Sequence, residues 1–371
     1  MEIISPLVSA IDAVTHPNPY PFYAELVAHQ PLYFDETLRL WVASSAEAVT
    51  QIMNHPACRV RPMGEPVPRG LVGSMAGVIF EHLARMNDGP KHTSLKHDVT
   101  ARIAQLDVIT VGQKWASDLG RGVGHLNLNL NEFAFALPVY IMADLLGVPS
   151  QQIPETVGWV REFARCLNPL STPEQVAIGK TAAEKLMGML QPAYGEIWAA
   201  NLIGLMFQAY EATAGLIGNT LAALGNDPDL YNQVMCSPGL LPQLIQEMVR
   251  FDPAVQNTRR YLSEDVTVAG QAMQAGDAIL VVLAAANRDP ELNPEPNQFQ
   301  LFRRDRRTFT FGQGVHSCPG EMLAYNMAQA GIEQMLWLGV GQNIHVKAIG
   351  YQPYVNLRIP ILLWENNGRD F

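Results

Sequence analysis

The sequence predicts a mainly α-helical protein with small β-sheets. From Ala84 to about Met235 the apolar residues recur with helical spacing, and residues 320–339 return to that pattern. By contrast, residues 32–44 and 252–290 contain short runs of branched and aromatic residues around turn residues. Hydrophobic residues make up 48% of the 371 residues and charged residues only 16%, which favours a folded core over a disordered chain.

The N-terminal elements are expected to be short. Residues 32–44 alternate as in a hairpin-like pair of strands, and a helix should follow at residues 46–54. Residues 59–79 carry prolines and glycines among apolar residues, so they predict an irregular loop rather than a linker between domains.

The later elements are longer and mostly helical. Residues 137–149 predict a buried helix that ends at Gly147 and Pro149. A long apolar helix is expected over residues 196–224, short strands over 252–290 and a final helix over 320–339. No internal repeat or low-complexity tract divides the chain, so a single domain over residues 1–371 is predicted.

The charge and the hydropathy pattern limit the partners. With 25 Lys and Arg against 35 Asp and Glu, the net charge is −10, which argues against a general nucleic-acid binder. The first 23 residues lack a basic segment followed by an apolar one, and no long uninterrupted apolar run occurs. We therefore expect no secretory signal, no membrane span and a cytoplasmic location.

The four cysteines are scattered along the chain. Their spacing fits neither a disulfide framework nor a structural zinc site, so at most one is expected to carry chemistry: they are Cys58, Cys166, Cys236 and Cys318. Cys318 lies in a glycine-punctuated loop directly before a predicted helix, and a helix N-terminus favours thiolate over thiol. This arrangement suits a metal held by one sulfur.

The loop around Cys318 resembles the haem-binding signature of the cytochrome P450 superfamily, F-G-x-G-x-H-x-C-x-G. Every fixed position matches, and the residues that carry the match are Phe311, Gly312, Gly314, His316, Cys318 and Gly320. The resemblance implies the cytochrome P450 fold, haem b as cofactor and Cys318 as the axial ligand of its iron. It also implies that His92, Lys96, Arg260 and His316 bind the haem propionates.

Three further features lie in or around this loop. Glu247 and Arg250 are similar to the family's E-x-x-R pair, a buried ion pair that supports the cysteine loop. Gln298 stands where the family usually has a third partner, an arginine, so the usual triad is incomplete. Pro319 has no N–H to donate toward the sulfur, which suggests either a more electron-rich thiolate or simply a helix start.

The oxygen-side helix departs from the family pattern. Residues 201–219 align with the family's long I helix, in which an acid and an alcohol follow each other. Glu211 supplies the acid, but Ala212 replaces the alcohol, and Thr213 lies about 100° further around the helix. Three hypotheses remain: a substrate hydroxyl or water replaces the alcohol, the oxidant drives coupling or ring formation, or the enzyme accepts hydrogen peroxide.

Gln208 is the second departure, because the family normally has a small residue facing the iron there. Gly204, Gln208, Ala212 and Leu216 repeat at every fourth position and share one helix face. If this face meets the haem, the Gln208 amide donates to bound oxygen or anchors a polar substrate group. The alternative is that Gln208 points toward a neighbouring helix.

Two surfaces are expected to contact other molecules. Residues 59–86 match the family's variable B–C region, whose apolar side chains form either a substrate wall or core. The interval from Pro149 to Glu211 is shorter than is usual in the family, so either the F–G lid or the G–H connection is shortened. Four arginines within five positions either guide an acidic partner or form a solvated run: Arg303, Arg304, Arg306 and Arg307.

The resemblance implies a haem-thiolate monooxygenase that oxidises a small to medium, mostly apolar molecule, as in secondary metabolism. No flavin or iron–sulfur motif is recognisable in the sequence, so electrons are expected from a separate ferredoxin or flavodoxin. The alternatives are oxidative coupling or cyclisation, use of peroxide, and a haem-based binding or gas-sensing protein. The substrate, its oxidised position and the oligomeric state do not follow from the sequence.

Overall fold

The computed structural model describes residues 9–124, 129–340 and 344–366. The helices of this part are α1 (Tyr20–His29), α2 (Ala46–Asn54), α3 (Met75–His82), α4 (Gly89–Ile103), α5 (Val108–Gly124), α6 (Leu130–Leu145), α7 (Ile153–Cys166), α8 (Pro173–Tyr194), α9 (Glu196–Asn226), α10 (Pro228–Cys236), α11 (Leu241–Phe251), α12 (Leu283–Ala286) and α13 (Glu321–Trp337). Among the described residues, no helix combines the length and apolar character needed to cross a membrane.

The strands form one larger sheet and two hairpins. They are β1 (Leu32–Asp35), β2 (Leu40–Ala43), β3 (Cys58–Arg59), β4 (Thr258–Leu262), β5 (Val266–Val268), β6 (Gln271–Met273), β7 (Ala278–Val281), β8 (Ile344–Tyr351) and β9 (Pro360–Asn366). The larger sheet has the order β1-β2-β7-β4-β3, in which β2 and β7 are parallel and the other pairs antiparallel. The mainly helical class with small sheets is therefore confirmed.

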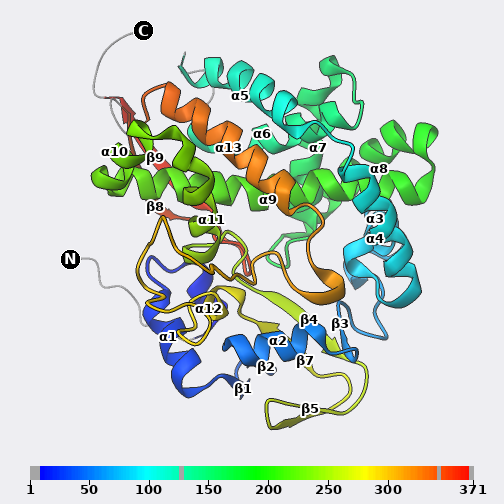
Figure 1. Ribbon diagram of the computed structural model, residues 1–371. Helices are drawn as coiled ribbons and strands as arrows, with labels where there is room; N and C mark the ends of the chain where they lie inside the picture. Colours follow the sequence, from blue (N-terminus) through cyan, green and yellow to red (C-terminus); the bar gives the residue numbers. More distant parts are fainter. Residues whose placement is uncertain (1–8, 125–128, 341–343, 367–371) are drawn as a thin grey trace.

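Helix α9 runs through the middle of the molecule (Figure 1). Helices α5, α6 and α13 lie on one side of it, and the larger sheet with α1 and α2 lies on the other. Most residues of α9 are buried, and its apolar side chains join those of α5, α6, α11 and α13 in the largest core cluster. A long connection from α12 returns to the start of α13 and carries the cysteine loop toward α4 (Figure 1).

Most predicted elements are confirmed, and two needed correction. The predicted helix at residues 46–54 is α2, and the pair of strands in residues 32–44 is β1 and β2. Residues 59–79 are more regular than expected, because Ser74 caps α3 by accepting from the Gly77 N–H. The helix predicted over 137–149 begins earlier, at the capping box formed by Asn129 and Glu132. The prediction that the chain has no secretory signal falls on its first 23 residues, and of these residues 1–8 lie outside the described residues.

Candidate active site

The cysteine loop is closed by its own backbone. The N–H of Cys318 donates to the carbonyl oxygen of Phe311 at 2.7 Å. Gly312 and Gly314 have φ angles of 70° and 63°, which favour glycine. A Cβ atom at Gly314 would lie 2.5 Å from Oδ1 of Asn54, so a side chain there would collide with α2. These glycines let the chain turn tightly and present Cys318 just before α13.

The Cys318 thiol lies in a recess. Its side chain is exposed, yet burial raises the pKa of the thiol. The N–H of Gly320 donates a hydrogen bond to Sγ, and the charges of Arg85 and Lys96 oppose the effect of burial on the pKa. A side chain that is open to solvent and still surrounded by protein faces a concave space. A single sulfur in such a place fits a metal carried by a macrocycle, as in haem proteins with a cysteine ligand.

Three of the four residues expected to bind the propionates lie together between α4 and the cysteine loop. The rings of His92 and His316 are tilted by 32° relative to each other, with their centroids 4.1 Å apart. The Lys96 ammonium donates to the carbonyl oxygens of Val315 and Ser317 at 2.6 and 2.7 Å. Lys96 therefore joins α4 to the cysteine loop in addition to any role toward a cofactor.

The two histidines of this cluster have different surroundings. Burial, together with the charges of His316 and Lys96, lowers the pKa of His92 to about 4, so His92 is a neutral hydrogen-bond donor at pH 7. Nε2 of His316 lies 3.0 Å from Oδ1 of Asp88. Burial raises the pKa of Asp88, but the hydrogen bond with His316 and the N–H of Val60 outweigh it and leave the pKa lowered. Asp88 was not among the predicted site residues, although an aspartate directly before a helix is a recognisable signal.

Arg260, which lies on β4, is the fourth residue expected to bind the propionates. Its side chain is buried, its Nη1 donates to the carbonyl oxygen of Arg259 at 2.8 Å, and burial lowers its pKa. Among the described residues, no carboxylate lies within ion-pair distance of Arg260. A buried guanidinium without an anion is costly and favours a negatively charged partner. The donors of His92, Lys96, Arg260 and His316 therefore fit the two carboxylates of a haem.

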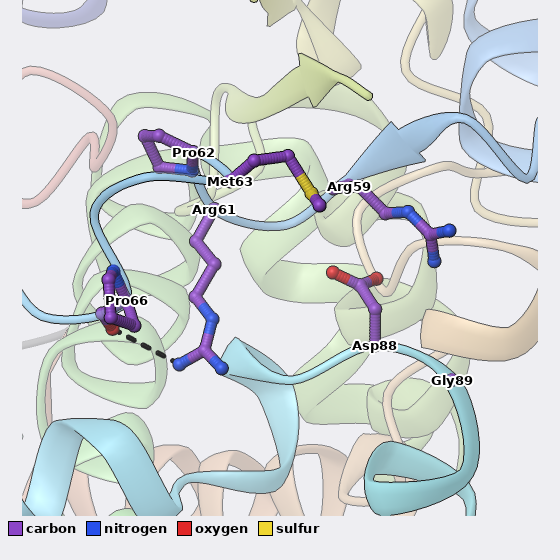
Figure 2. Close-up of a pocket in the computed structure, with 7 residues that line it drawn as sticks. All are labelled: Arg59, Arg61, Pro62, Met63, Pro66, Asp88 and Gly89. Carbon is purple, nitrogen blue, oxygen red and sulfur yellow. Dashed lines mark hydrogen bonds between the residues drawn. The ribbon is translucent and has the colours of Figure 1, made fainter. Parts of the chain in front are cut away.

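A pocket of about 290 Å³ adjoins this cluster at the start of α4. Figure 2 shows Asp88 directed between Met63 and Arg59, whereas Arg61 extends toward Pro66 at the other end. Arg61 donates to the carbonyl oxygen of Pro66 at 3.1 Å and to Oδ1 of Asn87 at 3.0 Å. Through the contact of Asp88 with His316, the pocket is linked to the residues expected to bind the propionates.

The ion pair behind the cysteine loop is larger than the sequence indicated. Glu247 and Arg250 are fully buried and lie 2.6 Å apart. Arg303 and Arg306 also donate to the Glu247 carboxylate, at 3.1 and 2.8 Å. Burial raises the pKa of Glu247, but the hydrogen bonds from Arg250 and Arg306 outweigh it, so the pKa is lowered. The side chain of Gln298 is not needed, since arginines further along the chain take the third place.

This network changes the interpretation of the four arginines in residues 303–307. The Arg303 side chain is only 4% exposed and Arg306 only 13%. Both are therefore internal partners of Glu247 rather than part of a docking surface. Arg304 and Arg307 remain exposed.

One face of α9 retains exposed surface. Between Asn201 and Leu221, the partly exposed residues are Leu205, Gln208, Ala209, Glu211 and Ala212. The spacing of Leu205, Gln208, Ala209 and Ala212 places these four on one side of the helix. Thr213 lies off this face and is only 1% exposed. Its hydroxyl therefore does not take the place of the alcohol that is missing at Ala212.

Gln208 bonds to its own helix and reaches the segment between α3 and α4. Its amide Nε2 donates to the carbonyl oxygen of Gly204 at 2.7 Å, one turn earlier in α9. Its Oε1 accepts a long contact of 3.5 Å from Nη1 of Arg85. The amide donor is thus engaged by the backbone, and the carbonyl oxygen faces an arginine that the sequence analysis did not identify.

Glu211 lies in a desolvated environment. Burial raises the pKa of its carboxyl to about 7, although a hydrogen bond with Tyr354 and the charge of Arg85 act in the opposite direction. Tyr354 belongs to the connection between β8 and β9, far from α9 in the sequence. No motif marks Tyr354, so its place beside Glu211 could be found only from the structure.

The region predicted as an apolar substrate wall is divided. Val60, Leu71 and Ile79 are buried in the protein core, whereas Met63 is 72% exposed. Four other apolar side chains of this region are partly buried: these are Val67, Met75, Val78 and Phe80.

The shortened stretch before Glu211 contains α7 and α8, and α8 passes to α9 through Gly195 alone.

Comparisons with known proteins agree with this architecture. A family model described as Cytochrome P450 matches residues 239–337. Pulcherriminic acid synthase of Bacillus subtilis (strain 168) is 26% identical over 358 residues, covering 83% of this chain and 85% of that protein. The biotin biosynthesis cytochrome P450 of the same organism is 24% identical, covering 92% of this chain and 94% of that protein.

The fold is also shared with solved structures. The crystal structure of CalO2 has a TM-score of 0.82 at 21% sequence identity, with 97% of this chain and 99% of that chain covered. Three findings lead to one conclusion: relatives match along most of the chain, the family model matches α11 to α13, and the fold is shared. The chain belongs to the bacterial-type cytochrome P450 family, whose members are haem-dependent monooxygenases that act on small molecules with electrons from redox partners.

Proposed function

We propose that Cys318 is the axial ligand of haem b and that the chain, as one domain over residues 1–371, oxidises a small to medium, mostly apolar molecule with O₂. The single observation that carries this proposal is the recessed thiol of Cys318, held by a closed loop and a Gly320 N–H at the start of α13. When bound, haem supplies the oxidising chemistry, for which a thiolate ligand favours O–O cleavage.

The residues around Cys318 hold the cofactor in this proposal. His92, Arg260 and His316 offer donors to the propionates, and Lys96 fixes the cysteine loop against α4 while remaining close enough to contribute its charge. Phe311, Gly312 and Gly314 shape the loop, and the Gly320 N–H donates to Sγ. The network of Glu247 and Arg250 supports the loop from behind.

Glu211 supplies the proton in place of an acid–alcohol pair. A carboxyl with a pKa of about 7 is partly protonated at neutral pH, which suits a general acid. The Tyr354 hydroxyl orients the carboxyl by hydrogen bonding to it. Ala212 leaves space on the same face of α9 for water or a substrate hydroxyl, which then passes the proton on.

Electrons come from a separate ferredoxin or flavodoxin. Arg304 and Arg307 are the exposed members of the cationic run, and acidic redox proteins are attracted to such charges. The exposed apolar side chains of Phe302, Val315 and Met322 lie close to them in the sequence, around the cysteine loop. Relatives named for pulcherriminic acid synthesis and biotin biosynthesis support a role in making a small metabolite, including secondary metabolites.

The test is turnover with a ligand first identified by optical titration of the ferric protein. With ferredoxin, its reductase and isotopically labelled O₂, we expect a product that has gained one labelled oxygen atom. A product that has lost two hydrogens instead would establish the coupling or cyclisation alternative, which Ala212 favours. Product formed from peroxide alone would establish the peroxide alternative. Intact ligand binding with no reduction by any redox protein would favour a sensor.

A further inference from the structure

Arg85 is a cation that lies beside α9, the helix on the oxygen side of the site. It lies in a 3₁₀ turn, Ala84–Met86, between α3 and α4. Its side chain is exposed, yet burial lowers its pKa, so it faces a concave space as Cys318 does. The charges that act on it come from Cys318 and Glu211. Within the described residues no carboxylate forms an ion pair with it, and its contact with Gln208 is long, at 3.5 Å.

The backbone that carries Arg85 is fixed against α9. Asn201 accepts from the N–H of Ala84 at 2.9 Å and donates to the carbonyl oxygen of His82 at 2.9 Å. Asn87 donates back to the carbonyl oxygen of Leu83 at 2.7 Å. A Cβ atom at Gly204 would lie 2.7 Å from Leu83, so the glycine allows this segment to approach the helix closely. The position of Arg85 is therefore built into the fold before any ligand binds.

Gln208 directs the guanidinium rather than neutralising it. Because its Nε2 is engaged by the Gly204 carbonyl, its Oε1 is turned toward Arg85. An amide oxygen accepts a hydrogen bond but carries no formal charge. Glu211 is the carboxylate whose charge acts on Arg85. Burial keeps Glu211 partly protonated, so it does not cancel the positive charge of Arg85. A desolvated guanidinium in such a place gains most from an anion, which it binds through paired N–H donors.

We propose that Arg85, directed by Gln208, recognises the carboxylate of the substrate, which is an organic acid with an apolar body. This inference rests on the proposed function and names its substrate class. One guanidinium matches one carboxylate, while the propionates of the cofactor have His92, Arg260 and His316 as their own donors. The apolar body of the acid then lies along the face of α9 that carries Ala209 and Ala212.

The experiment is an optical and equilibrium-dialysis titration of the ferric holoprotein with matched acids and esters. The probes are decanoic acid, phenylacetic acid and indole-3-acetic acid, each beside its methyl ester. Arg85→Gln is compared with Arg69→Gln, because Arg69 lies in the same region of the chain but its side chain is 93% exposed and paired with Glu65. Bound haem is measured in each protein, so that loss of cofactor is separated from loss of ligand.

The wild type and Arg69→Gln proteins are expected to bind at least one acid on the order of tenfold or more tightly than its ester. Arg85→Gln should remove this preference and leave ester binding and haem content unchanged. Equal binding of acid and ester by the wild type, or a preference that survives Arg85→Gln, would overturn the proposal. Loss of haem from Arg85→Gln would overturn it as well, since Arg85 would then serve a propionate. A wild type that lacks a thiolate-type spectrum contradicts the proposed function instead.

Discussion

On the sulfur side of the site, every fixed position of the family signature is present, and the structure holds Cys318 by backbone hydrogen bonds and glycine conformations. On the oxygen side, Ala212 replaces an alcohol and Gln208 replaces a small residue, and remote side chains surround Glu211. The difference teaches which part of the chemistry is shared with the family. Cofactor binding follows the common pattern, whereas proton delivery and substrate recognition belong to this chain.

The largest expected effect comes from a change in the ion-pair network behind the cysteine loop. Glu247→Gln leaves the guanidiniums of Arg250, Arg303 and Arg306 without their shared carboxylate. Because breaking a buried ion pair leaves uncompensated charge, we expect a loss of about 3–5 kcal/mol in the free energy of unfolding. Urea unfolding of the holoprotein measures it. Glu65→Gln removes an exposed ion pair and should cost less than about 1 kcal/mol; equal stability of the two variants would refute a supporting role for Glu247.

A comparable change on the oxygen side affects turnover instead of stability. Glu211→Gln removes the proposed proton donor, and we expect the yield of product per electron consumed to fall on the order of 100-fold. In the wild type, the raised pKa of about 7 means that the carboxyl is protonated below pH 7, so this yield should decline as the pH rises through 7. The pH profile of product yield measures this. A decline that persists in Glu211→Gln would assign it to another group.

Restoring the family residue sharpens the comparison. Ala212→Thr places a hydroxyl on the partly exposed face of α9. If the reaction inserts oxygen, the product yield per electron should rise by roughly a few-fold, because an additional hydroxyl aids proton transfer. Ala212→Val is the matched control, since valine has nearly the shape of threonine without its hydroxyl. The same yield from both variants would mean that the hydroxyl is irrelevant to this reaction.

The smallest effect concerns the electron density on sulfur. Pro319→Leu introduces an N–H beside Cys318, and the Gly320 N–H already donates to Sγ. One added hydrogen bond worth roughly 0.5–1.5 kcal/mol corresponds to a rise of about 20–60 mV in the one-electron reduction potential. Spectroelectrochemistry of the ferric protein measures it, with Pro62→Leu as a control away from the sulfur. An unchanged potential would favour the other role of Pro319, as a helix start.

The sequence predicted those parts of the molecule that depend on local backbone requirements. The cysteine loop, α2 and α9 follow from glycine positions, capping residues and apolar spacing, all of which are local. Arg85, Tyr354 and the Arg306 contact with Glu247 depend on segments that meet only in the folded chain. Arg303 and Arg306 looked like surface cations for the same reason. Asp88 has a local signal, its place directly before α4, but its contact with His316 also depends on segments that are distant in the sequence.

The most direct test of the account is the absorption spectrum of the reduced, carbon monoxide-bound holoprotein, recorded for the wild type and for Cys318→His. We predict a thiolate-type spectrum for the wild type and an imidazole-type spectrum for the variant, with circular dichroism showing that both remain folded. An imidazole-type spectrum in the wild type, or the same spectrum in both proteins, would contradict ligation by Cys318.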